Sequence, residues 1–374
     1  MRVVQIIDNL DWGGAQKMMS LLARELVARQ VKVVAIGLDG DDDGAHYKKV
    51  LLDYGIDVLP VTGKYLLDLK RITTLIHLMR QGEIDLIQTH LSYANILGVL
   101  AGRLAGLPVV VTLHSTGVDR RYYHPVRYRL ETLALRCIGC RVVAVGHTVA
   151  KTQQMRMGSK KRITVIPNAM TVFPEMPSLE RDKFRLALIG RSDGSILISV
   201  GRLSPDKGYA DMLTAFAMTL QSHPSASLVI VGEGLLADEL KLQASSLGIE
   251  KNVFFLGARD DVPLLLKASD MYVSASYREG MSMSLLEAMA ASLPTVATSV
   301  GDAPRMFDEG TGILIQPGNP SELAEAIHSL LVDPTRMHKM GSEACKRVVA
   351  EYGLASWVSA YINLYREMLQ HNDH

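Results

Sequence analysis

The stretch ILISVGRLSPDKG, residues 196–208, holds the pattern on which the fold prediction depends. It begins with an apolar run, Ile196–Val200, that lacks the strict alternation of polar and apolar residues expected of a strand with one solvent-exposed face. Such a run is typical of a parallel strand covered by helices on both sides. A turn containing glycine and proline follows, and a helical stretch comes after the turn. The stretch therefore predicts one strand-to-helix unit of a parallel α/β sheet.

The same unit recurs before and after this stretch. The earlier expected strands are Val3–Ile7, Val31–Leu38, Ile56–Val61, Ile84–Thr89, Val109–Leu113, Val142–Val145 and Ile163–Ile166. The later ones are Leu228–Val231, Val253–Leu256, Met271–Ala275 and Thr295–Thr298. Helical stretches such as Ala15–Arg29, Leu69–Gln81 and Asn95–Ala105 lie between them. Repeated alternation of this kind predicts doubly wound parallel sheets.

The rhythm breaks between Pro167 and Gly194, where prolines and glycines lie among polar residues, and a linker is expected there. The chain has 374 residues, too many for one ordinary core. We therefore expect two Rossmann-like domains, residues 1–175 and 190–350, and a C-terminal helix, residues 351–374, that packs back toward the first domain. Two such domains would face each other across a cleft at the carboxyl ends of their strands, where these folds bind ligands.

Composition excludes several classes of protein. The formal net charge of +1 argues against a nucleic-acid binder that works by bulk charge. Asp8 and Asp11 occur where a signal peptide would still be apolar, and no apolar run reaches the roughly 20 residues that span a bilayer. Three cysteines do not make a disulfide framework, so we expect a cytoplasmic protein. Cys137 and Cys140 form a C-x-x-C, which we interpret as buried thiols because no second pair completes a zinc site.

The first motif with possible chemistry is Gly13-Gly14, between the first strand and the first helix. Backbone N–H groups can approach an anion there, because a helix N-terminus carries partial positive charge. The motif lacks the G-x-G-x-x-G spacing of a dinucleotide fold, which disfavours NAD binding. A tight strand-to-helix turn would explain the two glycines equally well.

The second motif is the turn that holds Arg202 and Lys207. Two cations at the carboxyl end of a strand could meet a diphosphate. A solvated turn is the alternative, and it is the commoner case for lone basic residues. The position at a strand end favours the functional interpretation.

The third motif runs from Arg278 to Ala290. Gly280 and the following serines open a helix whose first amides could hold phosphate. Glu279 would lie just outside this helix and Glu287 about two turns into it, and such carboxylates accept hydrogen bonds from sugar or ribose hydroxyls. Alternatively, Ser284 and Glu287 form a capping box, in which Glu287 serves only the start of the helix.

Together these motifs resemble the retaining glycosyltransferases of the GT-B fold, family GT4 (glycosyltransferase group 1). The matched elements of the family are G-R-x-x-x-x-K-G, E-x7-E, the donor-phosphate loop, the P-N turn and a G-x-G after the second strand of the second domain. The residues that match them are Arg202 with Lys207, Glu279 with Glu287, Gly13-Gly14-Ala15, Val165–Asn168 and Gly232-Glu233-Gly234. The resemblance covers nearly the whole chain and is strongest from Ser199 to Ala290.

The resemblance implies a role for each matched residue. The implied catalytic set is His114, Arg202, Lys207 and Glu279, and the implied donor-binding set is Gly13, Gly14, Gly232, Gly234, Met283, Ser284 and Glu287. Arg202 and Lys207 would stabilise the leaving diphosphate. Glu279 and His114 would contact the donor sugar, and Glu287 would hold the ribose. A lone histidine after a strand can also be plain packing, and His90, which ends the neighbouring strand, is given that interpretation.

The implied reaction is transfer of a sugar from a nucleotide-diphosphate donor, with a UDP-sugar favoured. Fixed cations and amides at the diphosphate would replace a metal ion, so no metal or other cofactor is expected. Asp41-Asp42-Asp43 contains a D-x-D that would suggest a metal-dependent alternative. Met281 and Ser282 depart from the E-x-F-G form common in the family, which leaves the donor sugar open. A nucleotide-sugar epimerase and a non-catalytic nucleotide-sugar binder are the other functions considered.

The acceptor side is predicted from a basic region between Arg120 and Arg162. A helix starting at Pro125 would place Val126, Leu130, Leu133 and Cys137 on its apolar face and leave Arg129 and Arg136 on a polar one. The region would suit an anionic acceptor or an anionic membrane surface. An ordinary solvated face is the alternative. Because related enzymes build bacterial surface polysaccharides on lipid carriers, the resemblance implies a glycan or lipid-linked acceptor and a peripheral place at the inner face of the cytoplasmic membrane.

Overall fold

A computed structural model describes residues 1–39, 45–63, 65, 67–117, 124–137, 140–158 and 162–370. The chain divides into two compact units. Unit 1 comprises Met1–Asn168 and Leu354–His374, and unit 2 comprises Ala169–Gly353. In the described part of the chain, no helix combines the length and apolar character needed to cross a membrane.

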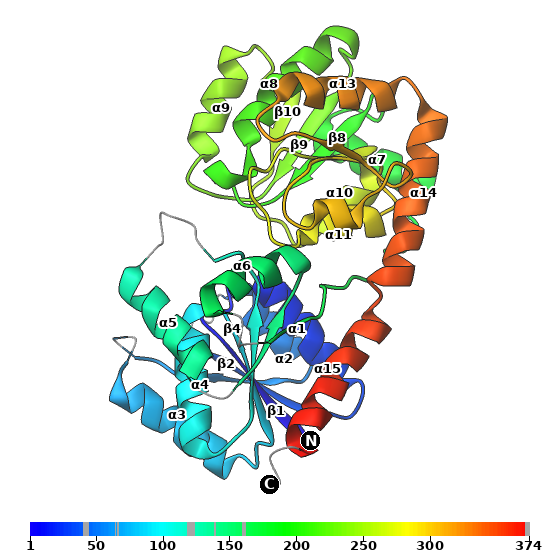
Figure 1. Cartoon of the computed structure of the whole chain (residues 1–374). Helices are drawn as coiled ribbons and strands as arrows, with labels where there is room; N and C mark the ends of the chain where they lie inside the picture. The colour runs from blue at the N-terminus through cyan, green and yellow to red at the C-terminus, as the bar shows by residue number, and fades with distance from the viewer. Residues whose placement is uncertain are drawn as a thin grey trace. The chain divides into compact units, whose positions relative to one another are not determined.

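Unit 1 is built on one parallel sheet in the order β3-β2-β1-β4-β5-β6-β7. Its strands are β1 (Arg2–Ile7), β2 (Lys32–Gly37), β3 (Asp57–Pro60), β4 (Leu86–His90), β5 (Val109–Leu113), β6 (Arg141–Ala144) and β7 (Ile163–Val165). Its helices are α1 (Gly14–Val27), α2 (His46–Asp53), α3 (Leu69–Gln81), α4 (Ser92–Ala105), α5 (Pro125–Cys137), α6 (His147–Met157) and α15 (Leu354–Gln370). Figure 1 carries these labels.

Unit 2 contains a second parallel sheet in the order β10-β9-β8-β11-β12-β13. Its strands are β8 (Ile196–Val200), β9 (Ser227–Val231), β10 (Val253–Phe255), β11 (Met271–Ser274), β12 (Thr295–Thr298) and β13 (Ile313–Ile315). Its helices are α7 (Ser178–Ile189), the 3₁₀ turn η1 (Pro205–Lys207), α8 (Tyr209–Ser222), α9 (Ala237–Ser246), α10 (Val262–Ala268), α11 (Met283–Ala290), α12 (Ala303–Met306), α13 (Pro320–Leu331) and α14 (Pro334–Glu351).

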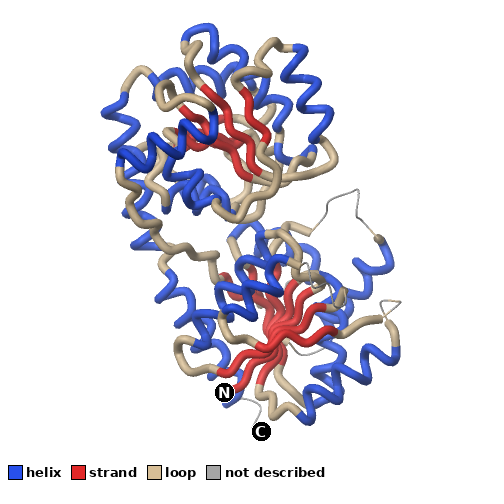
Figure 2. Tube along the Cα trace, turned by 180° about the vertical axis from the view of Figure 1, so that it is seen from behind, coloured by secondary structure: helices blue, strands red, loops and turns tan. Residues whose placement is uncertain are grey.

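Helices cover both faces of each sheet, as Figure 2 shows. The central strands are accordingly buried along their whole length: every residue of β4, β5 and β9 is buried. In unit 2 two apolar clusters form, one containing Ile198 and Val229 and the other Leu197 and Leu228, so successive residues of a strand point to opposite sides. This burial explains the absence of polar alternation in the sequence and confirms the predicted doubly wound parallel sheets.

Residues 176–189, which the sequence analysis placed in neither domain, contain helix α7 of unit 2. Its Arg185 is 3% exposed, and its guanidinium donates to Asp270 Oδ2 at 2.9 Å and to the carbonyl of Ala268 at 3.2 Å. Arg181 donates to Asp270 Oδ1 at 2.6 Å, and the backbone N–H of Ile196 donates to Asp270 Oδ2 at 2.7 Å. A single carboxylate therefore ties α7 to the first strand of the second sheet.

The last helix, α15, belongs to unit 1 and packs beside α1 (Figure 1). Tyr361 and Tyr365 on α15 are buried. The hydroxyl of Tyr365 donates to Gln88 Oε1 in β4. The chain thus returns to its first sheet after completing the second one.

Each sheet reverses its winding at one place, between β1 and β4 in unit 1 and between β8 and β11 in unit 2. At such a switch point the loops leaving the two neighbouring strands run to opposite faces of the sheet and leave a crevice at the carboxyl edge. The residues predicted to act on the donor follow these strands. Gly13 and Gly14 follow β1, Arg202 and Lys207 follow β8, and Glu279 follows β11.

Candidate functional site

The switch point of unit 2 brings Lys207 and Glu279 into direct contact. Lys207 Nζ lies 2.6 Å from Glu279 Oε1, and both side chains are largely shielded, with 20% and 13% of their surface exposed. Ser276 Oγ donates to the same Glu279 oxygen at 2.8 Å. The two charges are 72 residues apart in the sequence, and they meet because β8 and β11 are neighbours in the sheet. Ser276 was missed by the sequence analysis, although its place two residues after a strand was a usable signal.

Backbone contacts hold the two loops against each other. The carbonyl of Asp206 accepts from the N–H of Tyr277 at 2.8 Å. Gly208 has a positive φ of 65°, and a Cβ there would lie 2.0 Å from the carbonyl oxygen of Ala275. Only glycine permits this approach. The turn that carries Lys207 is therefore fixed on the end of β11, and the position of the ammonium group is set by the fold.

Helix α11 begins at Met283, with Ser282 as its N-cap residue. Met283 and Ser284 therefore lie in the first turn, where backbone N–H groups have no partner within the helix. Glu287 lies in the second turn and is 5% exposed. The capping-box interpretation is wrong, because it requires Ser284 to be the N-cap residue. Glu287 is thus a buried carboxylate whose presence helix capping does not explain.

The remaining predicted residues of unit 2 lie in the loops after β8 and β9. The Arg202 side chain is exposed, and none of the ion pairs among the described residues includes it. Gly232 and Gly234 make close backbone contacts with the loop that holds Arg202. A Cβ at Gly234 would lie 2.3 Å from the carbonyl oxygen of Leu203, and one at Gly232 would lie 2.0 Å from that of Gly201. Close backbone packing therefore requires glycine at both positions, independently of any contact with a ligand.

In unit 1 the predicted loop, Asn9–Gly14, leads from β1 into α1, whose first residue is Gly14. Asn9 Oδ1 accepts from Gln16 Nε2 at 2.6 Å, which fixes the loop on the first turn of α1. The carboxylate of Asp8 accepts from the backbone N–H of Ala94 at 2.7 Å, at the start of α4. Burial raises the pKa of Asp8 to about 7, even though the backbone N–H groups of Ala94 and Tyr93 oppose the shift.

His114 directly contacts His90 across the ends of β4 and β5. His90 Nδ1 lies 2.8 Å from His114 Nε2, and His90 Nε2 lies 2.7 Å from Gln5 Oε1. Gln5 Nε2 in turn donates to Gln88 Oε1 at 3.1 Å, which orients the Gln5 amide. His90 is 1% exposed. It therefore belongs to a buried row of hydrogen-bonded polar groups and does not serve only as a packed side chain.

These hydrogen bonds determine the tautomers of both imidazoles. Burial lowers the pKa of His114 to about 4 and lowers the pKa of His90 well below its usual value, so both rings are neutral near pH 7. A neutral His90 that donates from Nε2 to Gln5 must accept at Nδ1. His114 therefore donates from Nε2 to His90 and keeps its Nδ1 as a hydrogen-bond acceptor. Gln5 was not singled out in the sequence, because its contact arises only when β1 and β4 pair.

The buried pair predicts a specific dependence of stability on pH. The pKa values of His90 and His114 are both lower in the folded than in the unfolded protein. Their contribution to the free energy of unfolding is therefore complete above the unfolded pKa of about 6.5, and it is lost as the pH falls toward 4. His90→Gln keeps a donor for Gln5 and an acceptor for His114 but cannot titrate. In urea unfolding at pH 7 and at pH 4, we expect the free energy of unfolding of the variant to fall less between the two pH values than that of the wild type. His77→Gln, which removes an exposed histidine of α3, is the control. If the free energy of unfolding depended on pH equally in the wild type and in His90→Gln, the assignment of a buried, neutral His90 would be refuted.

The basic region differs from its prediction. Arg156 is buried, with 7% of its side chain exposed, and forms an ion pair with Glu131 at 2.8 Å. Because Glu131 also accepts from Asn95 at 2.8 Å, helix α5 turns this carboxylate inward. The expected apolar face is therefore wrong: Val126 and Leu133 are each 56% exposed. Residues 118–123, 138–139 and 159–161, and the side chain of Cys137, lie outside the described part of the structure.

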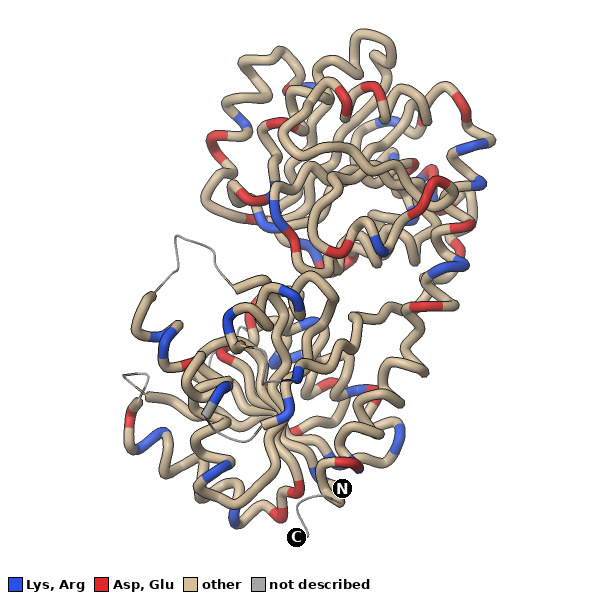
Figure 3. Tube along the Cα trace, in the orientation of Figure 1, with Lys and Arg blue, Asp and Glu red and all other residues tan. Residues whose placement is uncertain are grey.

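The predicted D-x-D at residues 41–43 also lies outside the described residues. Among the residues that are described, no three side chains of the His, Cys, Asp and Glu types are grouped closely enough to hold a metal ion. Figure 3 shows Lys and Arg interspersed with Asp and Glu in both units. Local charge at the two switch points, and not bulk charge, is therefore the electrostatic feature that a ligand would encounter.

Family models match both halves of the chain. The model described as glycosyl transferases group 1 matches residues 160–347, and the model described as glycosyltransferase family 4 matches residues 12–172. The two matches include the loop at Gly13-Gly14, the turn at Lys207 and the start of α11.

Curated relatives and solved structures agree with these matches. A UDP-Gal:alpha-D-GlcNAc-diphosphoundecaprenol alpha-1,3-galactosyltransferase of Escherichia coli is 28% identical over 314 residues, covering 81% of this chain and 80% of the relative. An N-acetyl-alpha-D-glucosaminyl L-malate synthase of Bacillus anthracis has the same identity and coverage. The structure of Anabaena HepE in complex with UDP-glucose has a TM-score of 0.88 at 24% identity, covering 98% of this chain and 100% of that one. Sucrose-phosphate synthase of Thermosynechococcus elongatus has a TM-score of 0.82 at 20% identity, covering 99% and 100%. These structural likenesses establish a common fold.

Proposed function

The chain belongs to the glycosyl transferases group 1 family and has the GT-B fold, and we propose that it moves a sugar from a UDP-sugar to a glycan or lipid-linked acceptor with retention of anomeric configuration. UDP is favoured because the Escherichia coli relative is named for a UDP-Gal donor and HepE is described in complex with UDP. The acceptor class and a place in bacterial surface polysaccharide synthesis are favoured by the diphosphoundecaprenol in the name of the same relative.

The observation that carries the proposal is the Lys207–Glu279 contact at the switch point of unit 2. Breaking the bond between the anomeric carbon and the phosphate oxygen places negative charge on the β-phosphate. A fixed ammonium group, an exposed guanidinium at Arg202 and the first-turn N–H groups of α11 would stabilise that charge without a metal ion. Glu279 would then be displaced from Lys207 toward the hydroxyls of the sugar. Glu287, buried in the second turn of α11, would accept from the ribose hydroxyls.

The remaining residues of the proposal lie in unit 1. The N–H groups at Gly13 and Gly14 open α1, where partial positive charge favours phosphate. His114 would receive a sugar hydroxyl at Nδ1, because its Nε2 hydrogen is directed to His90. Arg202, Lys207, Glu279 and His114 together form the proposed catalytic set. Gly232 and Gly234 would act by placing the Arg202 loop.

Product analysis tests this proposal directly. The protein is incubated with UDP-glucose, UDP-galactose, UDP-N-acetylglucosamine and GDP-mannose, and products are followed by proton NMR. A retaining transferase that uses water slowly in place of its acceptor releases the nucleotide and, first, the α-anomer of the sugar. Appearance of a different nucleotide sugar would identify an epimerase instead. Binding with no turnover of any donor, even with added acceptor glycans, would identify a non-catalytic binder.

Helix α5 supports a peripheral place on an anionic membrane. Val126, Arg129, Leu133 and Arg136 follow one another at helical spacing, and all four are exposed. An exposed helix face that combines apolar and basic side chains suits a surface of anionic lipid. The face is small, so we propose reversible contact, with the bulk of the protein in the cytoplasm.

We expect the protein to co-sediment with vesicles of phosphatidylglycerol and phosphatidylcholine, but not with phosphatidylcholine alone. Because lipid charge drives the contact, about 0.5 M salt should release the protein. Arg129→Glu together with Arg136→Glu should abolish co-sedimentation, whereas Arg103→Glu on α4 together with Lys70→Glu on α3, both exposed, is the charge-matched control. Equal binding to both vesicle types, or unaffected binding by the double variant, would remove the membrane contact from the proposal.

A further inference from the structure

Trp12 presents an aromatic surface next to the Gly13-Gly14 loop. It is 50% exposed, although it is the largest apolar side chain in the loop. Its indole stacks on the imidazole of His46, with ring centroids 3.7 Å apart and planes at 19°. Tyr47 meets the indole edge-on, with centroids 6.4 Å apart and planes at 73°. The indole is therefore held in place from one side.

The start of α2 is fixed to the same loop. The backbone N–H of Tyr47 donates to the carbonyl of Leu10 at 2.9 Å. His46 and Tyr47 contact each other edge to face, with centroids 4.8 Å apart. Since both supporting rings are anchored at one helix start, the indole has a fixed support on the loop. An exposed tryptophan supported in this way is suited to bind a flat apolar surface.

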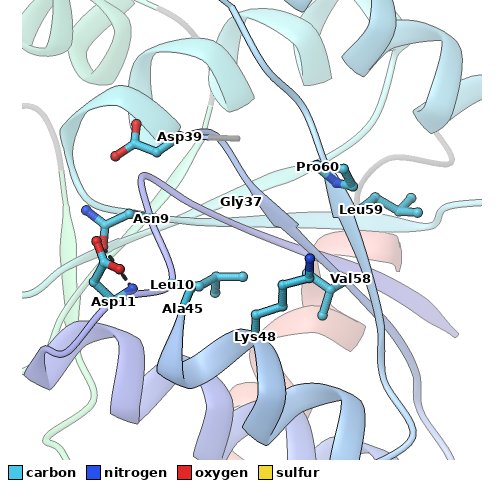
Figure 4. Close-up of a pocket in the computed structure, with 10 residues that line it drawn as sticks. All are labelled: Asn9, Leu10, Asp11, Gly37, Asp39, Ala45, Lys48, Val58, Leu59 and Pro60. Carbon is cyan, nitrogen blue, oxygen red and sulfur yellow. Dashed lines mark hydrogen bonds between the residues drawn. The ribbon is translucent and has the colours of Figure 1, made fainter. Parts of the chain in front are cut away.

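A pocket with both polar and apolar lining lies at the carboxyl edge of β1, β2 and β3 (Figure 4). Two of its lining residues, Asp11 and Ala45, are the sequence neighbours of Trp12 and His46. Its lining includes Asn9, Asp11 and Asp39, and also Lys48, which lies two residues after His46. Pro60 and Leu59 supply an apolar part of the wall. Carboxylates accept hydrogen bonds from hydroxyls, and amide and ammonium groups donate to them. A fixed indole can bind the apolar C–H face of a pyranose ring, and the polar groups of the pocket can bind its hydroxyls.

We propose that Trp12 and this pocket bind a sugar ring of the acceptor, with the apolar C–H face of the ring on the indole and its hydroxyls toward Asp11 and Asp39. The inference rests on the proposed transferase function and adds to it the chemical class of the acceptor end. The ring belongs to the acceptor and not to the donor, because the two carboxylates and one ammonium group of the lining leave a net negative charge that disfavours a nucleoside diphosphate. A neutral hydroxylated ring meets no such repulsion.

The fluorescence of Trp12 tests the proposal without knowledge of the natural acceptor. The chain contains two tryptophans, and Trp357 is 5% exposed, so acrylamide quenching of the protein reports mainly on Trp12. We expect methyl α-D-glucopyranoside or methyl N-acetyl-α-D-glucosaminide, at millimolar concentration, to lower the quenching constant at least twofold. Sorbitol, which has hydroxyls but no ring face, should leave the constant unchanged. Trp12→Phe identifies the part of the signal that belongs to Trp12.

Activity provides the second readout. Trp12→Ala should raise at least tenfold the concentration of methyl glycoside that half-maximally stimulates UDP release. Tyr54→Ala, at the opposite end of α2, is the matched aromatic control.

Two outcomes would overturn the inference. One is quenching unaffected by every methyl glycoside; another is protection by UDP-glucose alone, which would make Trp12 a donor contact. Protection by methyl glycosides in a protein that binds no nucleotide sugar would support the sugar subsite while the proposed transferase function fails.

Discussion

Replacing Lys207 with alanine will lower the turnover number by about a hundredfold to a thousandfold, the usual cost of removing one group that stabilises charge in a transition state. Two loops with fixed backbone contacts hold the ammonium group in place, 2.6 Å from Glu279, so that only Glu279 has to move when the phosphate arrives. The fold should change little, because Lys207 lies in the short η1 turn and Ser276 still donates to Glu279 after the substitution.

Nucleotide release under saturating donor measures this effect, and thermal unfolding measures the fold. Lys241→Ala is the matched control, since Lys241 is 58% exposed on α9 and lies 3.9 Å from its partner Asp238. We expect normal turnover for the control. A rate within threefold of wild type for Lys207→Ala would contradict the assigned role of the ammonium group.

Replacing Asp270 with alanine will lower the free energy of unfolding by about 3 kcal/mol, because it leaves the buried guanidinium of Arg185 without its counter-charge. Arg185 is 3% exposed, and the same carboxylate also binds Arg181 and the N–H of Ile196. Contacts of Arg185 with the carbonyls of Ala268 and Ser192 survive, which keeps the loss at the lower end of the range for a broken buried pair.

Urea unfolding gives the free energy, and turnover at 20 °C shows whether the folded protein still works. Asp261→Ala is the control, because Asp261 pairs at 2.6 Å with Arg259, whose side chain is 42% exposed, and such pairs contribute under about 1 kcal/mol. If Asp270→Ala were as stable as Asp261→Ala, α7 would not depend on this carboxylate. Turnover near the wild-type value is expected, since Asp270 lies before β11 and the predicted site lies after it.

The strands were predictable because burial on both faces leaves a direct trace in the sequence. Runs such as Leu228–Val231 are apolar throughout, and a short apolar run between turn signals has few other interpretations in a repeated pattern. β13, Ile313–Ile315, was missed because Gly310, Gly312 and Pro317 around it indicate a turn. α7 was missed because its flanking prolines and glycines outweighed a helix that is bound by charge as much as by apolar contact.

The face of α5 was mispredicted for a related reason. Apolar periodicity placed Val126 and Leu133 inward, but Glu131 and Arg156 form a buried ion pair that turns the helix. Apolar periodicity predicts which side chains are buried away from water. It does not predict that a charged residue is buried with a partner 25 residues away in the sequence.

For the site, the sequence predicted which loops matter but not which groups touch. Lys207 and Glu279 could be placed at strand ends, and their contact required the order β8-β11 in the sheet. The His114–His90–Gln5 chain was hidden for the same reason, because it crosses three strands. Roles for Arg202, Gly13 and Glu287 stay predictions that ligand-binding measurements must test.

Calorimetric titration with UDP tests the central claim most directly, because the account depends on positive groups that receive a nucleoside diphosphate. We expect the wild-type protein to bind UDP without added metal, and Lys207→Ala to bind at least tenfold more weakly while it remains folded at the temperature of the titration. A folded wild-type protein that binds neither UDP nor GDP would contradict the account.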